Sequence, residues 1–339
     1  MLTPPWFEVP PAGYGGIENV VAGLVDQLVA RGHHVTLLSA GRDLTDAQRH
    51  VPVFAETAQE PVGTGLVETG YAARAEAILR DLELDIIHDH TLAGVLSAPG
   101  RRVPTVHTVH NPVRGRFGDY LRALGSTIDP VAISRAQITA APDLPWAGCV
   151  LNGLDLSRFP YQPAKSDYVL FLGRILPEKG THLAIDAAAE ARVRIVVAGP
   201  CEDPREQTYF DAEIRPRLGR YAEWFGPADF AAKTKLLSSA RAVLCPFQWE
   251  EPFGLVVAEA MACGTPVIAT PRGAAPELIR NNVTGFLTPP GGMAQAIQQA
   301  ATIEPLACRT HAETTFGLDE MARCYERIYR NCIACRGRG

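Results

Sequence analysis

Two glutamates separated by seven residues are the clearest candidates for ligand chemistry in this sequence. Glu251 and Glu259 lie in the segment PFQWEEPFGLVVAEAMACGTPVIAT. Carboxylates accept hydrogen bonds from hydroxyl groups, and the N-terminus of the helix predicted over 255–262 favours a phosphate. The backbone N–H groups available at that turn belong to Phe253, Gly254, Leu255 and Val256. Acids on both sides of a phosphate position predict a nucleotide-sugar ligand, the alternative being two solvated surface acids.

Two cations follow another predicted strand, 168–172. Arg174 and Lys179 lie in the loop GRILPEKG. Fixed cations can hold a pyrophosphate and stabilise the charge that develops on it as it leaves. The loop is not a Walker A motif, because Lys179 precedes its glycine and no GK[ST] is present. The alternative is a pair of surface bases.

A glycine-rich turn near the start of the chain predicts a second anion site. Gly15 and Gly16 precede an amphipathic helix, and glycines allow backbone N–H groups to approach a phosphate. The spacing does not match the dinucleotide pattern GxGxxG. An NADP oxidoreductase stays open as an alternative only because Arg42, which follows the strand predicted over 34–39, could bind a 2′-phosphate. The first strand either is confined to residues 1–3 or begins upstream.

Histidines cluster at the ends of two predicted strands, 84–88 and 103–110. Their carboxyl ends form the edge at which open α/β sheets bind ligands, although most such histidines are structural. The four side chains are His88, His90, His107 and His110. The HDH sequence at 88–90 lacks a clear third metal ligand. The CxxC at Cys332 and Cys335 lacks the second pair that a structural zinc site needs, so no metal site is predicted at either place. Residues 114–120 are expected to form a polar loop at the same edge of the sheet.

The elements that position these residues predict an α/β protein of two domains. The chain has 339 residues, more than one core usually organises, and its strands alternate with helices. A proline-containing stretch over 159–163 places the boundary, giving domains over 1–158 and 159–317 and a terminal segment, 318–339, that carries one more helix.

Composition excludes several classes of protein. The formal net charge is −5, with acids and bases mixed along the chain, so no basic field for nucleic acid is predicted. No apolar run has membrane-spanning length and the first thirty residues do not resemble a secretion signal, so a cytoplasmic location is expected. Several of the eight cysteines lie in apolar segments and are interpreted as small buried hydrophobes, and a disulfide framework is not expected.

The segment that contains Glu251 and Glu259 resembles the signature of the family 4 retaining glycosyltransferases. That resemblance implies the GT-B fold, in which two Rossmann-like, doubly wound domains face each other across a cleft. The first domain would lie on the acceptor side and the second would bind the nucleotide sugar. The helix of segment 318–339 would cross back to the first domain.

The resemblance also implies roles for individual residues. Glu251 would bind donor-sugar hydroxyls and Glu259 the ribose, while Arg174 and Lys179, in a loop similar to the family's GRxxxxKG motif, would bind the diphosphate. In the first domain the family's glycine turn contacts the distal phosphate and the sugar, and its histidine lies near the sugar's hydroxymethyl group. These roles are carried to Gly15, Gly16 and His110, with His107 as the alternative histidine.

The function expected is transfer of a sugar, with retained anomeric configuration, from a nucleoside diphosphate sugar to an acceptor hydroxyl. A UDP-sugar is the favoured donor, and the acceptor is a sugar, a lipid-linked molecule or a natural product. No metal and no cofactor is expected, because fixed cations neutralise the diphosphate. The alternatives are a sugar-nucleotide epimerase or phosphorylase on the same fold, and a non-catalytic nucleotide-sugar binder.

Overall fold

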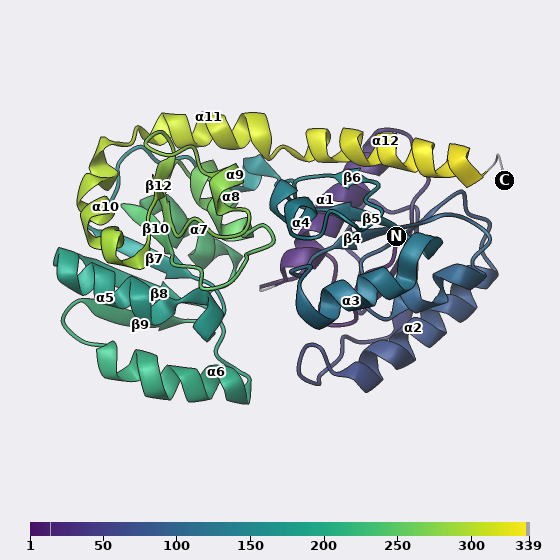
Figure 1. Cartoon of the computed structure of the whole chain (residues 1–339), viewed down its shortest axis with the longest axis horizontal. Coiled ribbons are helices and arrows are strands. Elements are labelled where there is room, and N and C mark those ends of the chain that lie inside the picture. Colours follow the sequence, from purple (N-terminus) through teal and green to yellow (C-terminus); the bar gives the residue numbers. More distant parts are fainter. Residues whose placement is uncertain (14, 337–339) are drawn as a thin grey trace. The chain divides into compact units, whose positions relative to one another are not determined.

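The chain folds into two α/β units, each built around a parallel sheet (Figure 1). The computed structural model describes residues 1–13 and 15–336. One unit comprises Met1–Gly153 together with the chain from Leu318 onward, and the other comprises Leu154–Gly317. The predicted α/β class with two doubly wound sheets is confirmed.

A very short strand organises the sheet of the first unit. Leu2 forms single parallel bridges to Leu38 and to Asp89, so residues 1–3 lie between two hydrogen-bonded groups of strands. The spatial order is β2-β1, then Leu2, then β3-β4-β5-β6. The strands are β1 (Thr36–Ala40), β2 (Arg49–Phe54), β3 (Ile87–Asp89), β4 (Thr105–Val109), β5 (Asp129–Ala132) and β6 (Gly148–Cys149). Residues 1–3 therefore occupy the position expected for the initial strand of this sheet.

The helices of the first unit include one in a segment predicted as a loop. They are α1 (Gly16–Ala30), α2 (Gly65–Arg80), α3 (Gly115–Leu124), α4 (Arg135–Ala140) and α12 (Leu318–Arg336). The loop expected over 114–120 is wrong, because α3 begins at Gly115. Leu121 and Leu124 of this helix are buried and pack in one cluster with Val109, with Phe117 against it. Glycines and charges at the start of the segment concealed this apolar helical spacing.

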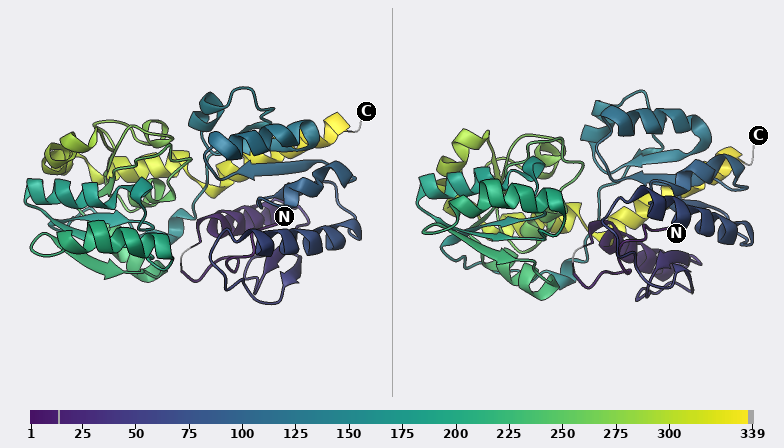
Figure 2. Two further views of the ribbon diagram at one scale, coloured as in Figure 1. Left: turned by 60° about the horizontal axis from the view of Figure 1, so that its bottom comes forward. Right: turned by 90° about the horizontal axis from the view of Figure 1, so that it is seen from below.

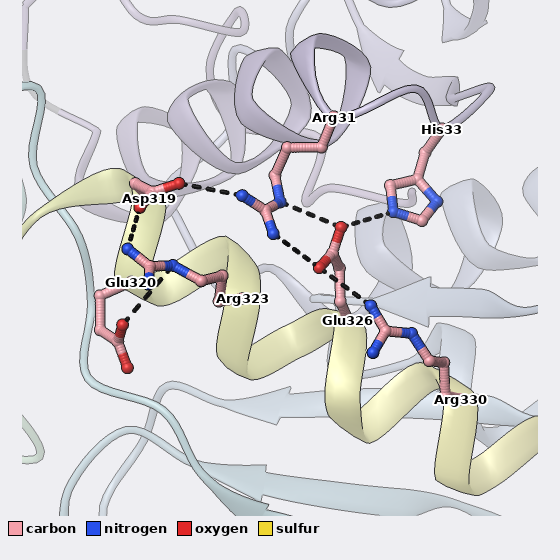
Figure 3. A network of polar contacts seen from close by, with 7 residues as sticks. All are labelled: Arg31, His33, Asp319, Glu320, Arg323, Glu326 and Arg330. Atoms are coloured by element: carbon pink, nitrogen blue, oxygen red, sulfur yellow. Dashed lines mark hydrogen bonds and ion pairs between the residues drawn. The ribbon is translucent and has the colours of Figure 1, made fainter.

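The last helix, α12, packs against α1 and completes the first unit (Figure 3). Glu326 accepts hydrogen bonds from Arg31 Nε at 3.0 Å and Arg31 Nη2 at 2.9 Å, and it also contacts His33 Nε2 at 2.8 Å and Arg330 Nη2 at 3.2 Å. The hydrogen bonds from Arg31, then from His33, lower the pKa of the Glu326 carboxyl to about 2. Buried Tyr325 and Tyr329 lie on the same helix.

The second unit has the strand order of a classical doubly wound fold. Its sheet runs β9-β8-β7-β10-β11-β12, all parallel, so the connection reverses direction between the neighbours β7 and β10. The strands are β7 (Tyr168–Leu172), β8 (Arg194–Ala198), β9 (Ala222–Gly226), β10 (Ala242–Cys245), β11 (Val267–Ala269) and β12 (Gly285–Leu287). Every residue of β10 is buried, as expected for a strand covered on both faces.

Helices cover both faces of this second sheet (Figure 2). They are α5 (Thr181–Ala191), α6 (Pro204–Tyr209), α7 (Phe230–Ser239), α8 (Leu255–Ala262), α9 (Ala275–Leu278), α10 (Met293–Gln299) and α11 (Pro305–Thr315). Helices α5 and α10 pack together, as do α8 and α11. Within the two described ranges, no helix is long and apolar enough to cross a membrane.

Candidate functional site

The strand order of the second unit brings three of its predicted site residues to the same edge of the sheet. Arg174 and Lys179 follow β7, and Glu251 follows β10. Because β7 and β10 are parallel neighbours, their carboxyl ends lie at the same edge of the sheet. This is the topological switch point, where open α/β sheets bind their ligands.

An ammonium group, a carboxylate and an indole meet at this edge. Lys179 Nζ donates to Glu251 Oε2 at 2.6 Å, and Trp249 Nε1 donates to the same oxygen at 2.8 Å. The Lys179 ammonium also lies 4.9 Å from the Trp249 ring centroid. Glu251 and Glu259 are only 6% and 8% exposed, so the alternative of solvated surface acids is wrong for both. Trp249 therefore orients Lys179 and Glu251 together.

Two glycines allow the loops around this group to approach each other. Gly180 has a left-handed φ of 73°, and a Cβ there would lie 2.2 Å from the Pro246 carbonyl oxygen. Gly273, with φ 55°, would place a Cβ 2.2 Å from the Glu251 carbonyl oxygen. Gln248 N–H donates to the Glu178 carbonyl at 2.8 Å, which ties the two loops together. A side chain at either glycine would displace the loop that carries Glu251 or Lys179.

Arg174 lies at the end of β7 in a different electrostatic setting. Its Nε donates to Glu206 at 2.6 Å, and its Nη2 donates to Asp203 at 2.5 Å. Asp203 and Glu206 also form the capping box of α6, so both acids are fixed by that helix terminus. The guanidinium is positioned firmly, but its charge is balanced by two carboxylates.

The predicted phosphate turn has the geometry of a helix N-terminus. Helix α8 begins at Leu255, as predicted, and Gly254 caps it with φ 85° and ψ 72°. The first backbone N–H of this turn to find a backbone acceptor is that of Val257, which bonds the Gly254 carbonyl. The positive end of the helix dipole and the preceding N–H groups can therefore receive a phosphate.

Glu259, one turn inside α8, has a partner that the sequence did not indicate. Lys233 Nζ, on α7, donates to Glu259 Oε1 at 2.6 Å. The same ammonium lies 5.1 Å from the Phe230 ring centroid. Lys233 and Glu259 come from different helices, so no spacing in the sequence could relate them.

The first unit also places a buried acid beside its glycine turn. Gly15 has a φ of 151°, and a Cβ there would lie 3.2 Å from Glu18 Oε2, while α1 begins at Gly16. Glu18 is only 3% exposed, and burial raises the pKa of its carboxyl to about 8. Glu18 was not predicted as a site residue. Its only signal was an acid in the first turn of an otherwise apolar helix.

The four histidines occupy two different environments. His90 Nδ1 and His110 Nε2 lie 2.9 Å apart, and the His88 and His90 rings contact each other at an interplanar angle of 36°, with centroids 4.1 Å apart. His107 is 1% exposed and its Nδ1 donates to the Asp89 carbonyl, whereas His110 is half-buried. His110 is therefore better placed than His107 to contact a ligand.

Asp89, between His88 and His90, is engaged in a buried ion pair. Its carboxylate accepts from Arg101 at 3.1 Å and from the Thr91 hydroxyl at 2.7 Å. Over the part of the chain that the structure describes, no three His, Cys, Asp or Glu side chains are grouped as a metal site would require.

Comparisons with known proteins agree with this fold. The model described as Glycosyltransferase Family 4 matches residues 14–142, and the model described as Glycosyl transferases group 1 matches residues 156–310. A D-inositol 3-phosphate glycosyltransferase from Frankia alni is 30% identical, with 98% of each chain covered.

Solved structures show the same architecture. AviGT4, a glycosyltransferase involved in avilamycin A biosynthesis, is 28% identical, with 98% of this chain and 97% of that chain covered and a TM-score of 0.73. The Anabaena protein HepE in complex with UDP-glucose is 22% identical, covers 96% of this chain and 98% of its own, and has a TM-score of 0.73. The chain belongs to the family 4 glycosyltransferases and has their GT-B fold.

Proposed function

We propose that this glycosyltransferase moves a sugar from a UDP-sugar to an acceptor hydroxyl with retention of anomeric configuration. The observation that carries the proposal is the contact of Lys179 with Glu251 at the switch point of the second sheet. An ammonium suits a diphosphate, and a buried carboxylate suits sugar hydroxyls. UDP is favoured because HepE, a structural neighbour, has been solved with UDP-glucose.

In the proposed reaction, donor binding separates the two partners of this ion pair. Lys179 moves onto the diphosphate, while Glu251, still held by Trp249, accepts a hydrogen bond from a donor-sugar hydroxyl. The first-turn N–H groups of α8 receive a phosphate oxygen, and Glu259 receives the ribose. The ammonium then stabilises the negative charge that grows on the leaving diphosphate.

The bond changes balance without a covalent enzyme intermediate. The bond from the anomeric carbon to the phosphate oxygen breaks, and a bond to the acceptor oxygen forms on the same face of the sugar. The acceptor's proton passes to the departing phosphate oxygen. We propose that no divalent cation is needed, because the Lys179 ammonium supplies positive charge to the diphosphate. Arg174 is also proposed to bind the diphosphate, although its charge is shared with Asp203 and Glu206. His110, Gly15 and Gly16 are proposed to contact the donor.

The test replaces one lysine and keeps a matched lysine as control. Lys179→Ala should lower kcat/KM for UDP-glucose by about 100- to 1,000-fold, the usual cost of removing a group that stabilises transition-state charge. Lys235→Ala, at an exposed position on α7, should leave kcat/KM unchanged. Release of UDP is measured across a panel of hydroxyl acceptors, with and without a chelator. Equal turnover by both variants would refute the role of Lys179.

The configuration of the product is a separate measurement. Proton NMR of the product at early times should show the anomeric configuration of the donor. An inverted product would overturn the retaining part of the proposal and leave the transfer itself standing.

A further inference from the structure

Three side chains of the first unit, Met1, His90 and His110, lie in a row of contacts that determines which nitrogen of His110 carries its proton. Nδ1 of His90 lies 2.9 Å from Nε2 of His110, a hydrogen-bonding distance. The other nitrogen of His90, Nε2, lies 3.2 Å from the Met1 Sδ atom. Each neutral imidazole has one nitrogen that donates and one that accepts, so the contact at one nitrogen decides the role of the other.

The thioether of Met1 determines which nitrogen donates and which accepts in these contacts. A thioether sulfur has no proton and acts only as a weak acceptor, so Nε2 of His90 must be the nitrogen that carries hydrogen. Nδ1 of His90 is then an acceptor, and Nε2 of His110 must donate to it. The reverse arrangement would place the lone pair of His90 Nε2 against the lone pairs of the Met1 sulfur.

Both rings are neutral, which this proton assignment requires. Burial, followed by the neighbouring histidines, lowers the pKa of His90 well below its ordinary value, and burial lowers the pKa of His110 to about 3. A charged ring would donate from both nitrogens and remove the distinction. At neutral pH each ring therefore holds one proton.

His90 is itself held in place from the opposite face. The His88 ring packs against it in a tilted arrangement, and His88 bonds Tyr329 OH of α12 and the Thr108 hydroxyl, each at 2.7 Å. These contacts leave His90 little freedom to rotate. The described residues offer no hydrogen-bond partner to Nδ1 of His110, and that ring is half-buried.

We propose that His90 is a positioning residue that holds His110 in the tautomer with its proton on Nε2, so that Nδ1 of His110 accepts a hydrogen bond from a donor-sugar hydroxyl. The second half of this inference rests on the proposed function. The first half concerns only the proton positions, and it can be measured without any transfer reaction.

The first experiment measures the tautomer directly. Long-range proton–nitrogen correlation spectra of the ¹⁵N-labelled full chain at neutral pH should show His110 protonated at Nε2 and unprotonated at Nδ1, and His90 with the same pattern. The spectrum of His110→Gln assigns the signals. Addition of UDP-glucose should shift the His110 Nδ1 signal, because that nitrogen accepts a new hydrogen bond. A proton on His110 Nδ1 would overturn the inference.

The second experiment removes the acceptor from the positioning residue. His90→Phe keeps an aromatic ring but cannot accept from His110, and kcat/KM for UDP-glucose should fall about tenfold or more, as loss of a supporting hydrogen bond commonly costs. His90→Asn can place its amide oxygen near the former Nδ1 and should stay within about threefold of the parent. Full kcat/KM in His90→Phe, with the fold intact by circular dichroism, would overturn the positioning role. If UDP-glucose is not used but the tautomer is as stated, the proposed function fails and the proton assignment stands.

Discussion

Glu18→Gln should increase the stability of the first unit at neutral pH. Glu18 is 3% exposed beside the glycine turn, and its pKa is about 8 against an ordinary 4.5. The folded state therefore binds the carboxyl proton more tightly than the unfolded state. The resulting stabilisation is complete below pH 4.5 and is lost as the pH rises to about 8.

The magnitude follows from the two pKa values. Each pKa unit corresponds to about 1.4 kcal/mol, and between about pH 4 and pH 7 the folded acid stays protonated while the unfolded acid ionises. The parent should therefore lose about 3 kcal/mol of unfolding free energy over that interval through this group. Glutamine resembles the protonated acid in shape and does not ionise, so the variant should not share the loss.

Urea denaturation at several pH values measures this difference. The stability of Glu18→Gln relative to the parent should rise by about 3 kcal/mol from about pH 4 to pH 7. Hydrogen exchange of the α1 amides assigns the change to this helix, since two units need not unfold together. Glu83→Gln, at an exposed position of the same unit, is the control. Parallel pH profiles for the parent and Glu18→Gln would refute the assignment of a buried, protonated Glu18.

Two further substitutions test contacts described above. Trp249→Phe removes the N–H that holds Glu251, and kcat/KM for UDP-glucose should fall about tenfold, with Trp224→Phe in the same unit as a control without that effect. Glu326→Gln should cost about 1–3 kcal/mol near neutral pH by urea denaturation, whereas Glu320→Gln on the exposed side of α12 should cost less than about 0.5 kcal/mol. Since the pKa of Glu326 is lowered from 4.5 to about 2, its contribution to the free energy of unfolding is present above pH 4.5 and disappears toward pH 2. If Glu326→Gln lost stability between pH 4.5 and pH 2 as steeply as the parent does, the ion pair would be contradicted.

Local sequence was sufficient to predict the bounds of an element where an apolar run ended at a glycine or proline. The strand Tyr168–Leu172 and the helix Leu255–Ala262 have the predicted bounds, because mostly buried apolar residues and strong stop residues determine both. Local sequence was insufficient for Gly115–Leu124, where helix formation depends on burial against β4. In that segment tertiary packing overrides the glycine and arginine content.

The partners of the site residues could not be predicted, because they come from distant parts of the chain. Lys233 reaches Glu259 from another helix, and two acids that cap α6 surround Arg174. The raised pKa of Glu18 depends on burial by the whole first unit. Motif spacing identifies the groups that can contact a ligand, but their charge balance is set by the tertiary fold.

The contribution of α12 to the first unit has a consequence for the order of folding during synthesis. Residues 154–317 are contiguous and emerge from the ribosome before Leu318, so the second unit can acquire its full set of contacts while the first still lacks a helix. Until α12 arrives, His88 has no Tyr329 and Thr108 has no Tyr325 to bond. The usual sequence of domain completion, from the amino terminus onward, is therefore expected to be reversed in this protein.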